Sequence, residues 1–308
     1  MWQIRRTPSN LCQVDEQPRT CPGIPRNPRR PRAVDCAGLK WAAGAQSAAL
    51  ERVVIEEPLA VEIAYERLGR PVVRILSVTM RTPGDDDELA LGFLYCESIV
   101  DRAADVLGGE LLGENSRGEK VPTWRVRLAL PPGNQAIERV SRGIITSAAC
   151  GLCGRTSLEG LRLRAAPGPA GRPPIAGEAV LAMPGKLRGL QKVYPETGGC
   201  HGAGLFDEAG EPLLVREDVG RHNAVDKVVG AALRGAVPMV GATLVLSGRA
   251  GFELVQKAAA AGVSLVVAVG APSSLAVQLA RDAGITLAGF ARDGRFNIYS
   301  QAGRLIQA

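Results

Sequence analysis

The sequence predicts an α/β protein with two domains that follow a basic N-terminal extension. The clearest evidence is an alternation of short apolar strands with helices over residues 243–288. A weaker pattern of strands and one helix covers residues 59–130. With 46% hydrophobic and 22% charged residues, the composition is that of a globular protein able to bury a core. We place a small α+β domain at 47–142 and an α/β domain at 143–308.

Residues 1–46 are predicted to be disordered, because they are rich in Pro and Arg and show no apolar period. Residues 1–40 hold eight basic and three acidic residues, which leaves 29 basic and 28 acidic residues for the rest of the chain. The folded body is therefore nearly neutral, and we expect no nucleic-acid partner despite the net charge of +6. Arg5 and Arg6 resemble a twin-arginine export signal, but no apolar run follows them. We expect a cytoplasmic protein without a membrane span.

The first domain is predicted to begin with two strands, at 59–65 and 72–80, on either side of a turn at 68–71. A helix follows, carrying Leu89, Leu91, Phe93 and Leu94. The acidic run at 85–88 suits the positive N-terminal end of this helix. A further strand is predicted at 122–130, and 167–174 is predicted to be a loop.

In the second domain, strands are predicted at 243–246, 265–269 and 285–288, with helices at 251–261 and 273–283 between them. Strands that are apolar throughout are typical of a parallel sheet covered by helices on both faces. Upstream, a strand at 213–215 precedes a helix for which Asn223 is the predicted N-cap, with Asp226 in its first turn. Ligands of such sheets bind at the carboxyl ends of the strands, so the loops there are the candidate site.

The sharpest local signal is the pair Cys150 and Cys153, separated by two residues and flanked by glycines. A reduced pair at this spacing can hold a disulfide, a metal ion or a sulfane sulfur. Arg155 would favour the thiolate, which is the form that attacks a persulfide or carries a transferred sulfur. A zinc site built from this pair, Cys200 and His201 is a less favoured alternative, because two adjacent residues fit one tetrahedral site poorly.

The loops at the predicted sheet edge carry groups that suit a phosphate or pyrophosphate. Arg221 and His222 lie at the start of a helix, where His222 is either an acid–base group or a structural histidine. Ser247 and Arg249 follow one strand. His201 lies in a glycine-rich segment whose backbone can approach a ligand closely; the alternative is a plain turn before a strand. The segment after the last strand completes the set with Phe290, Ala291, Arg292, Asp293, Gly294 and Arg295.

Together these motifs give the chain a resemblance to the formate dehydrogenase accessory sulfurtransferase family, FdhD, over residues 51–300. The run Glu-Asp-Val-Gly-Arg-His-Asn-Ala-Val-Asp-Lys at 217–227 is the most specific of them. Cys200 stands where an apolar residue would be expected in this family. The other motifs are found at 81–85, 150–154, 197–201, 247–249 and 290–295.

The resemblance implies a function that the residues alone do not. Members of the family accept sulfur from a cysteine desulfurase and pass it to the molybdenum bis(molybdopterin guanine dinucleotide) cofactor before its insertion into formate dehydrogenase. By motif, Cys150 would carry the persulfide with the assistance of Cys153, and residues 290–295 would help to bind the guanine dinucleotide. The resemblance also implies a cytidine-deaminase-like second domain, a homodimer and no intrinsic metal.

Two other classes compete with this interpretation. A zinc deaminase would need His-x-Glu and Pro-Cys-x-x-Cys, but Ala149 precedes Cys150 and Gly202-Ala203 follows His201. A non-catalytic chaperone of the cofactor or of apo-formate dehydrogenase would bind without moving sulfur. Replacement of Cys150 separates the chaperone from the carrier.

Overall fold

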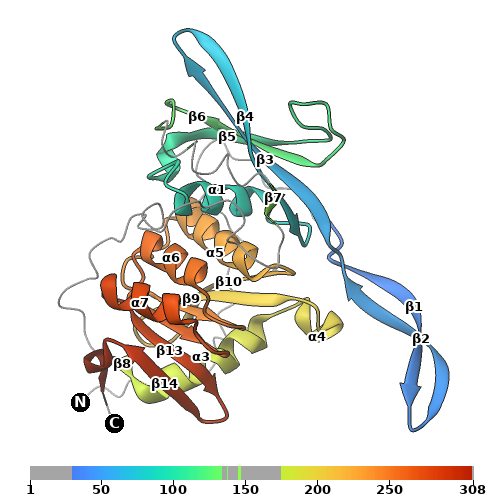
Figure 1. The fold of residues 1–308 in the computed structure, drawn as a ribbon, viewed down its shortest axis with the longest axis vertical. Coiled ribbons are helices and arrows are strands. Elements are labelled where there is room, and N and C mark those ends of the chain that lie inside the picture. The colour runs from blue at the N-terminus through green and yellow to red at the C-terminus, as the bar shows by residue number, and fades with distance from the viewer. Residues whose placement is uncertain (1–29, 134–136, 138–144, 147–174, 307–308) are drawn as a thin grey trace, which may run out of the picture.

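A computed structural model of the chain describes residues 30–133, 137, 145–146 and 175–306 (Figure 1). The described chain forms a mixed α/β structure with a five-stranded and a six-stranded sheet, and a separate two-stranded ribbon projects from it. The predicted domain boundary at 142/143 and the predicted loop at 167–174 lie outside the described residues. No helix in the described part of the chain is long and apolar enough to cross a membrane.

The five-stranded sheet and one helix enclose the first core. The strands predicted at 59–65 and 72–80 lie within β3 and β4, the strand predicted at 122–130 contains the shorter β6, and the helix predicted after the acidic run is α1. Leu89, Leu91 and Leu94 of α1 pack with Leu59, Ile63 and other apolar residues of the sheet. In sheet order the strands are β5 (Val106–Leu112), β6 (Thr123–Leu128), β3 (Glu57–Arg67), β4 (Arg70–Arg81) and β7 (Ile145–Thr146); the helices are α1 (Asp86–Cys96) and η1 (Ala103–Asp105).

The six-stranded sheet forms the body of the second unit. Its three central strands β11, β12 and β13 are parallel, as the sequence predicts, whereas β9, β10 and β14 run antiparallel to their neighbours. In sheet order the strands are β10 (Pro212–Asp218), β9 (His201–Phe206), β11 (Thr243–Leu246), β12 (Leu265–Ala268), β13 (Thr286–Arg292) and β14 (Arg295–Ser300).

Helices cover both faces of this sheet. One face packs in a single apolar cluster with α5, α6 and α7, and the other packs with α3 through Val180, Met183 and Leu187. Successive residues of the central strands alternate between the two clusters, which explains why these strands are largely apolar. The helices are α3 (Gly177–Leu190), α4 (Tyr194–Thr197), α5 (Arg221–Gly235), α6 (Phe252–Ala261), α7 (Ser274–Asp282) and η3 (Ala302–Arg304), and a small sheet pairs β8 (Ile175–Ala176) with β15 (Leu305–Ile306).

The two units meet where α1 lies against α5 (Figure 1). The helices approach so closely that a Cβ on Gly230 would lie 1.8 Å from the carbonyl oxygen of Glu88. A Cβ on Gly92 would lie 1.9 Å from the carbonyl oxygen of Asp226. Only glycine permits this separation, so the two residues fix how the first sheet sits on the second unit.

Three expectations from the sequence need correction. The predicted disorder of residues 1–46 is wrong for 33–42 and 45–46, because β1 (Ala33–Ala42) pairs along its whole length with β2 (Ala45–Val54). Helix α5 starts at Arg221 with Gly220 as its N-cap, so Asn223 is not the cap and Asp226 lies beyond the first turn. Strand β13 continues to Arg292, so the predicted loop at 289–295 is mostly strand around a tight turn at Asp293 and Gly294.

Candidate functional site

The topology of the six-stranded sheet gathers the predicted site residues at one edge. Ser247 directly follows β11, and Arg292 ends β13, so both lie at the carboxyl ends of parallel strands. Strand β9 runs in the opposite direction, which brings its first residue, His201, to the same edge. Asp218, the last residue of β10, pairs with His201 in the ladder. The observed strand directions therefore bring these residues to the sheet edge at which the sequence predicts a site.

A cavity of about 740 Å³ opens at this edge, which we call the sheet-edge cavity. One wall comes from α3 and the segment that leads to β9, and the opposite wall comes from the turn between β13 and β14. Its volume lies within the range of about 300–1,000 Å³ that is common for small-molecule sites. The lining residues are Leu181, Pro184, Gly185, Leu187, Arg188, Gln191, Tyr194, Gly198, Gly199, Cys200, His201, Ser247, Val269, Ala291, Arg292, Asp293 and Gly294.

The cavity brings together part of the predicted binding set. His201, Ser247, Ala291, Arg292, Asp293 and Gly294 line it. Its lining does not include Phe290, Arg295, Arg221, His222 and Arg249. Sequence reasoning placed all eleven in loops at one edge, but it could not tell which side chains share a wall.

His201 is held at the cavity by close packing and by the ends of two strands. A Cβ on Gly248 would lie 3.2 Å from Nδ1 of His201, so the imidazole packs against that glycine. The backbone amide of Gly202 donates to Oγ of Ser247 at 2.8 Å, and the amide of Ser247 donates back to the carbonyl of Gly202. Burial lowers the pKa of His201, and the nearby Arg221 and Arg249 lower it further. At neutral pH this ring is uncharged and can accept or donate a hydrogen bond.

His222 is outside the cavity lining and largely buried. Its Nε2 is 3.3 Å from Oε2 of Glu253, and its side chain is 17% exposed. Burial lowers its pKa to about 3, with further contributions from Lys257, Arg221 and His201. Of the two roles left open by the sequence, the surroundings favour a structural histidine that stays neutral.

Glu217 organises the cavity wall that precedes β9. Its carboxylate accepts hydrogen bonds from the backbone amides of Lys192, Val193 and Tyr194 at 2.6–2.9 Å. The side chain of Gln191 donates to the same carboxylate at 3.2 Å. A buried carboxylate with several N–H donors is well satisfied, so Glu217 fixes the loop that carries part of the wall.

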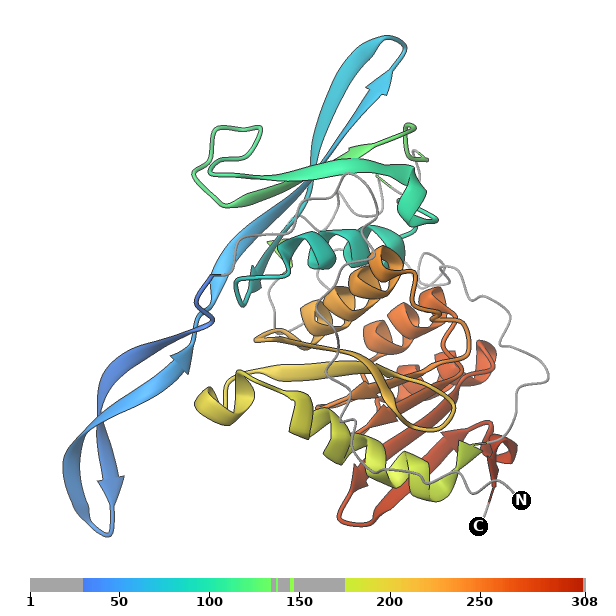
Figure 2. The same cartoon turned by 180° about the vertical axis from the view of Figure 1, so that it is seen from behind.

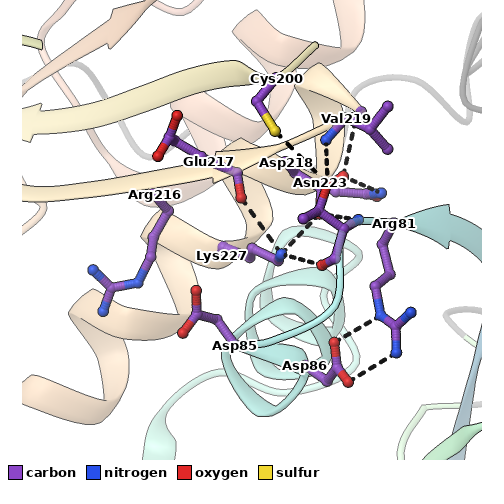
Figure 3. Close-up of polar contacts among 12 residues, drawn as sticks. Arg81, Asp85, Asp86, Cys200, Arg216, Glu217, Asp218, Val219, Asn223 and Lys227 are labelled. Carbon is purple, nitrogen blue, oxygen red and sulfur yellow. Dashed lines mark hydrogen bonds and ion pairs between the residues drawn. The ribbon is translucent and has the colours of Figure 1, made fainter. Parts of the chain in front are cut away.

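Asp218 and Lys227 form a second buried centre, shown in Figure 3. The Nζ of Lys227 lies 2.8 Å from Oδ2 of Asp218, and both side chains are fully buried. Lys227 also donates to the carbonyl of Thr82 at 2.9 Å, while the amide of Thr82 donates to Asp218 at 3.1 Å. Asn223 donates to the carbonyl of Met80 at 2.8 Å. These contacts attach the strand–helix turn of the first unit to the sheet edge of the second.

Cys200 lies between this centre and the cavity. Its Sγ is 3.8 Å from Oγ1 of Thr82, and the residue is only 4% exposed (Figure 3). Burial raises the pKa of its thiol to about 11. The thiol is therefore protonated at neutral pH and is a poor nucleophile.

The cavity wall contributed by α3 and the following loop is not predicted from the sequence. The guanidinium of Arg188 stacks over the ring of Tyr194, 3.4 Å from its centroid, and both residues line the cavity. A stacked arginine offers a fixed cation and several N–H donors to an anionic or planar ligand. No motif in the sequence marks these residues; only the fold brings them into the same cavity as Arg292.

Cys150 and Cys153 lie outside the described residues. The described chain before them ends at Thr146 in β7, which pairs with Thr79 of β4. The hydroxyl of Thr79 donates to Oδ1 of Asn223 at 3.2 Å. The segment that carries both cysteines therefore starts from a fixed point beside α5.

Comparison with known proteins gives a consistent result. The model of the FdhD/NarQ family matches residues 54–306. A protein of Nocardia farcinica named sulfur carrier protein FdhD is 44% identical over 259 residues, which cover 83% of this chain and 88% of the relative. A protein of the same name from Anaeromyxobacter dehalogenans strain 2CP-1 is 46% identical, with the same two coverages. The crystal structure of a putative formate dehydrogenase accessory protein from Desulfotalea psychrophila superposes with a TM-score of 0.68 at 25% identity, covering 90% of this chain and all of that one.

Proposed function

Because the chain belongs to the FdhD/NarQ family, we propose that it is a sulfur carrier that serves formate dehydrogenase. The observation that carries this proposal is the identity of 44% or more with relatives named sulfur carrier protein FdhD over most of both chains. The chain contains the chemical group that such a role needs, since Cys150 and Cys153 form a glycine-flanked pair of thiols.

In the proposed loading step, the Cys150 thiolate attacks the outer sulfur of a persulfide on a cysteine desulfurase. A new S–S bond forms at Cys150 while the S–S bond of the donor breaks, and the donor cysteine leaves as a thiolate. Cys153 then attacks the inner sulfur of the Cys150 persulfide. This closes a disulfide between Cys150 and Cys153 and releases the outer sulfur as hydrosulfide, with the two thiols supplying both electrons. This division of labour gives each member of the pair a defined role.

We propose that the substrate which receives this sulfur is the molybdenum bis(molybdopterin guanine dinucleotide) cofactor. The sheet-edge cavity, at about 740 Å³, has room for one nucleotide portion of it. Arg292 and Arg188 supply cations for phosphate, and the Asp293 carboxylate can accept from the N–H groups of guanine. The neutral His201 adds a hydrogen-bonding group without a charge. The proposal further includes a homodimer and a cytidine-deaminase-like fold for the second domain.

Sulfur loading is tested by intact-protein and peptide mass spectrometry after incubation with a cysteine desulfurase and cysteine. We expect one added sulfur atom on the peptide that contains Cys150, and none in Cys150→Ala. Cys36→Ala is the matched control, because Cys36 is an exposed free cysteine far from the pair in sequence. If the wild-type protein never acquires the atom, the carrier proposal fails.

The chaperone alternative is tested in a strain that lacks the native protein. A carrier predicts that Cys150→Ala does not restore formate dehydrogenase activity. Full activity with this variant would favour a chaperone that binds the cofactor or the apoenzyme without moving sulfur. Binding of guanosine diphosphate tests the cavity separately, and Arg292→Ala should weaken it without changing sulfur loading.

A further inference from the structure

The buried part of the sheet-edge cavity contains a side-chain amide, that of Gln191. Helix α3 crosses one face of the six-stranded sheet and leads toward α4, and Gln191 directly follows it (Figure 2). The residue is only 5% exposed, although it lines the cavity. A Cβ on Gly202 would lie 2.8 Å from Cδ of Gln191 and 2.9 Å from its Nε2, so the amide packs directly against the backbone of β9. Glycine at position 202 therefore admits the amide and holds it in place.

The contact with Glu217 fixes which end of this amide faces the cavity. The Glu217 carboxylate accepts hydrogen bonds from the backbone amides of residues 192–194, and a carboxylate can only accept. Gln191 must therefore turn its NH2 group toward Glu217, and its Nε2 donates to Oε1 of Glu217 at 3.2 Å. The carbonyl oxygen of the same amide accepts no hydrogen bond within the part of the chain that the structure describes. This oxygen is not sealed off from solvent, so the cavity that Gln191 lines receives a fixed hydrogen-bond acceptor.

Burial divides the cavity lining into a part suited to a neutral group and a part suited to charges. The uncharged, buried lining residues are Leu187, Gln191, Cys200 and Ala291. The charged lining residues, all of them exposed, are Arg188, Arg292 and Asp293. Removing a phosphate from water is costly, whereas burial of a neutral ring is favourable. A bound nucleotide is therefore best accommodated with its base among the buried residues and its phosphates at the exposed arginines.

We propose that the carbonyl oxygen of Gln191 accepts a hydrogen bond from the 2-amino group of guanine and so selects this base. The inference rests on the proposed binding of a guanine nucleotide, and it adds the residue that recognises the base. A single acceptor opposite N1–H would also approach O6 of the ring and be repelled, whereas opposite the 2-amino hydrogen next to N1 it meets only donors. The side chain of Asp293 is 78% exposed, so its hydrogen bonds compete with water and discriminate less. A buried acceptor such as Gln191 discriminates strongly, because a base without the donor leaves it unpaired.

The test compares guanosine diphosphate with inosine diphosphate, which lacks only the 2-amino group. We expect the full-length wild-type protein to bind guanosine diphosphate about 5–30-fold more tightly, measured by calorimetry. Gln191→Met keeps the length of the side chain and removes the acceptor, while three backbone donors remain on Glu217. This variant should bind guanosine diphosphate as weakly as inosine diphosphate, with inosine diphosphate binding close to that of the wild type. Lys192→Met is the matched control at an exposed position outside the cavity lining, and it should keep the wild-type ratio.

The ratio of the two affinities separates recognition of the base from a structural role of Gln191. If Gln191→Met weakens the binding of both nucleotides equally, the residue only supports the cavity wall and the inference is overturned. Equal binding of the two nucleotides by the wild-type protein overturns it without any variant and leaves the proposed nucleotide cavity intact. If the wild-type protein binds neither nucleotide, the inference and the proposed cofactor site fail together. Thermal unfolding midpoints establish that the variants are folded, and sulfur loading of the same samples tests the carrier proposal separately.

Discussion

The contact between α1 and α5 gives the sharpest stability prediction, for the substitution Gly230→Ala. Its new Cβ would lie 1.8 Å from the carbonyl oxygen of Glu88, a backbone atom that cannot rotate away. The helices must separate by more than 1 Å to restore an ordinary contact near 3.4 Å. Overpacking of this kind costs about 1–3 kcal/mol or more, and the better helix propensity of alanine returns up to about 1 kcal/mol. We expect the free energy of unfolding to fall by about 2 kcal/mol.

The assay is thermal unfolding followed by circular dichroism and calorimetry, where about 2 kcal/mol corresponds to a midpoint lower by roughly 4–8 °C. Gly235→Ala is the control in the same helix, because its Cβ would lie 3.5 Å from Val237, an ordinary contact. That variant should be neutral or slightly more stable. Gly92→Ala should behave like Gly230→Ala, since its Cβ would meet the carbonyl of Asp226 at 1.9 Å. If Gly230→Ala unfolds at or above the midpoint of Gly235→Ala, the helices are not in backbone contact and the reasoning is refuted.

Three further predictions concern the site and its supports. Lys227→Met should lower the free energy of unfolding by about 3 kcal/mol, because it leaves the fully buried Asp218 without its cation. Adding Asp218→Asn to this variant should recover part of the loss. An unchanged denaturant midpoint for Lys227→Met would contradict the pairing. The pKa of about 3 for His222 lies below its unfolded value, so below pH ~6.5 protons bind preferentially to the unfolded state and the free energy of unfolding decreases as the pH is lowered. His222→Asn lacks this loss, so between pH 7.5 and 5 its free energy of unfolding should rise by about 2 kcal/mol relative to that of the wild type. A difference between the two proteins that does not change with pH would count against a buried neutral ring. Tyr194→Ala removes the ring beneath Arg188 and should weaken guanosine diphosphate binding about 2–5-fold, measured by calorimetry. Lys192→Ala, at an exposed position nearby, is the control and should leave binding unchanged. Equal effects of the two substitutions would show that the stack does not shape the cavity.

The central strands and their helices were predictable because the apolar pattern of each segment by itself indicates which of its residues are buried. Apart from Thr243, residues 243–246 and 265–268 are apolar at every position, and the structure buries them on both faces. Chain direction then brings His201, Ser247 and Arg292 to one edge. Local pattern and strand order sufficed for that part of the site.

The remaining features depend on pairing between segments that the sequence does not mark. The strand at 33–42 is masked in the sequence by the Pro- and Arg-rich residues before it, and it forms because 45–54 pair with it. The wall at Arg188 and Tyr194 exists because α3 covers the far face of the sheet. Helix α5 begins at Arg221 and not after Asn223 because of a tertiary contact: the Asn223 side chain donates to the carbonyl of Met80 instead of capping its helix.

The run at 217–227, the motif most specific for the family, makes buried contacts between segments. None of its residues lines the sheet-edge cavity. Glu217 instead fixes the backbone at 192–194, and Lys227 and Asp218 together hold Thr82 of the first unit. Each of these side chains is buried, and each satisfies backbone groups of another segment. This motif therefore fixes one cavity wall through Glu217 and the contact between the two units through Asp218 and Lys227, while the residues that line the cavity come from segments with weaker patterns.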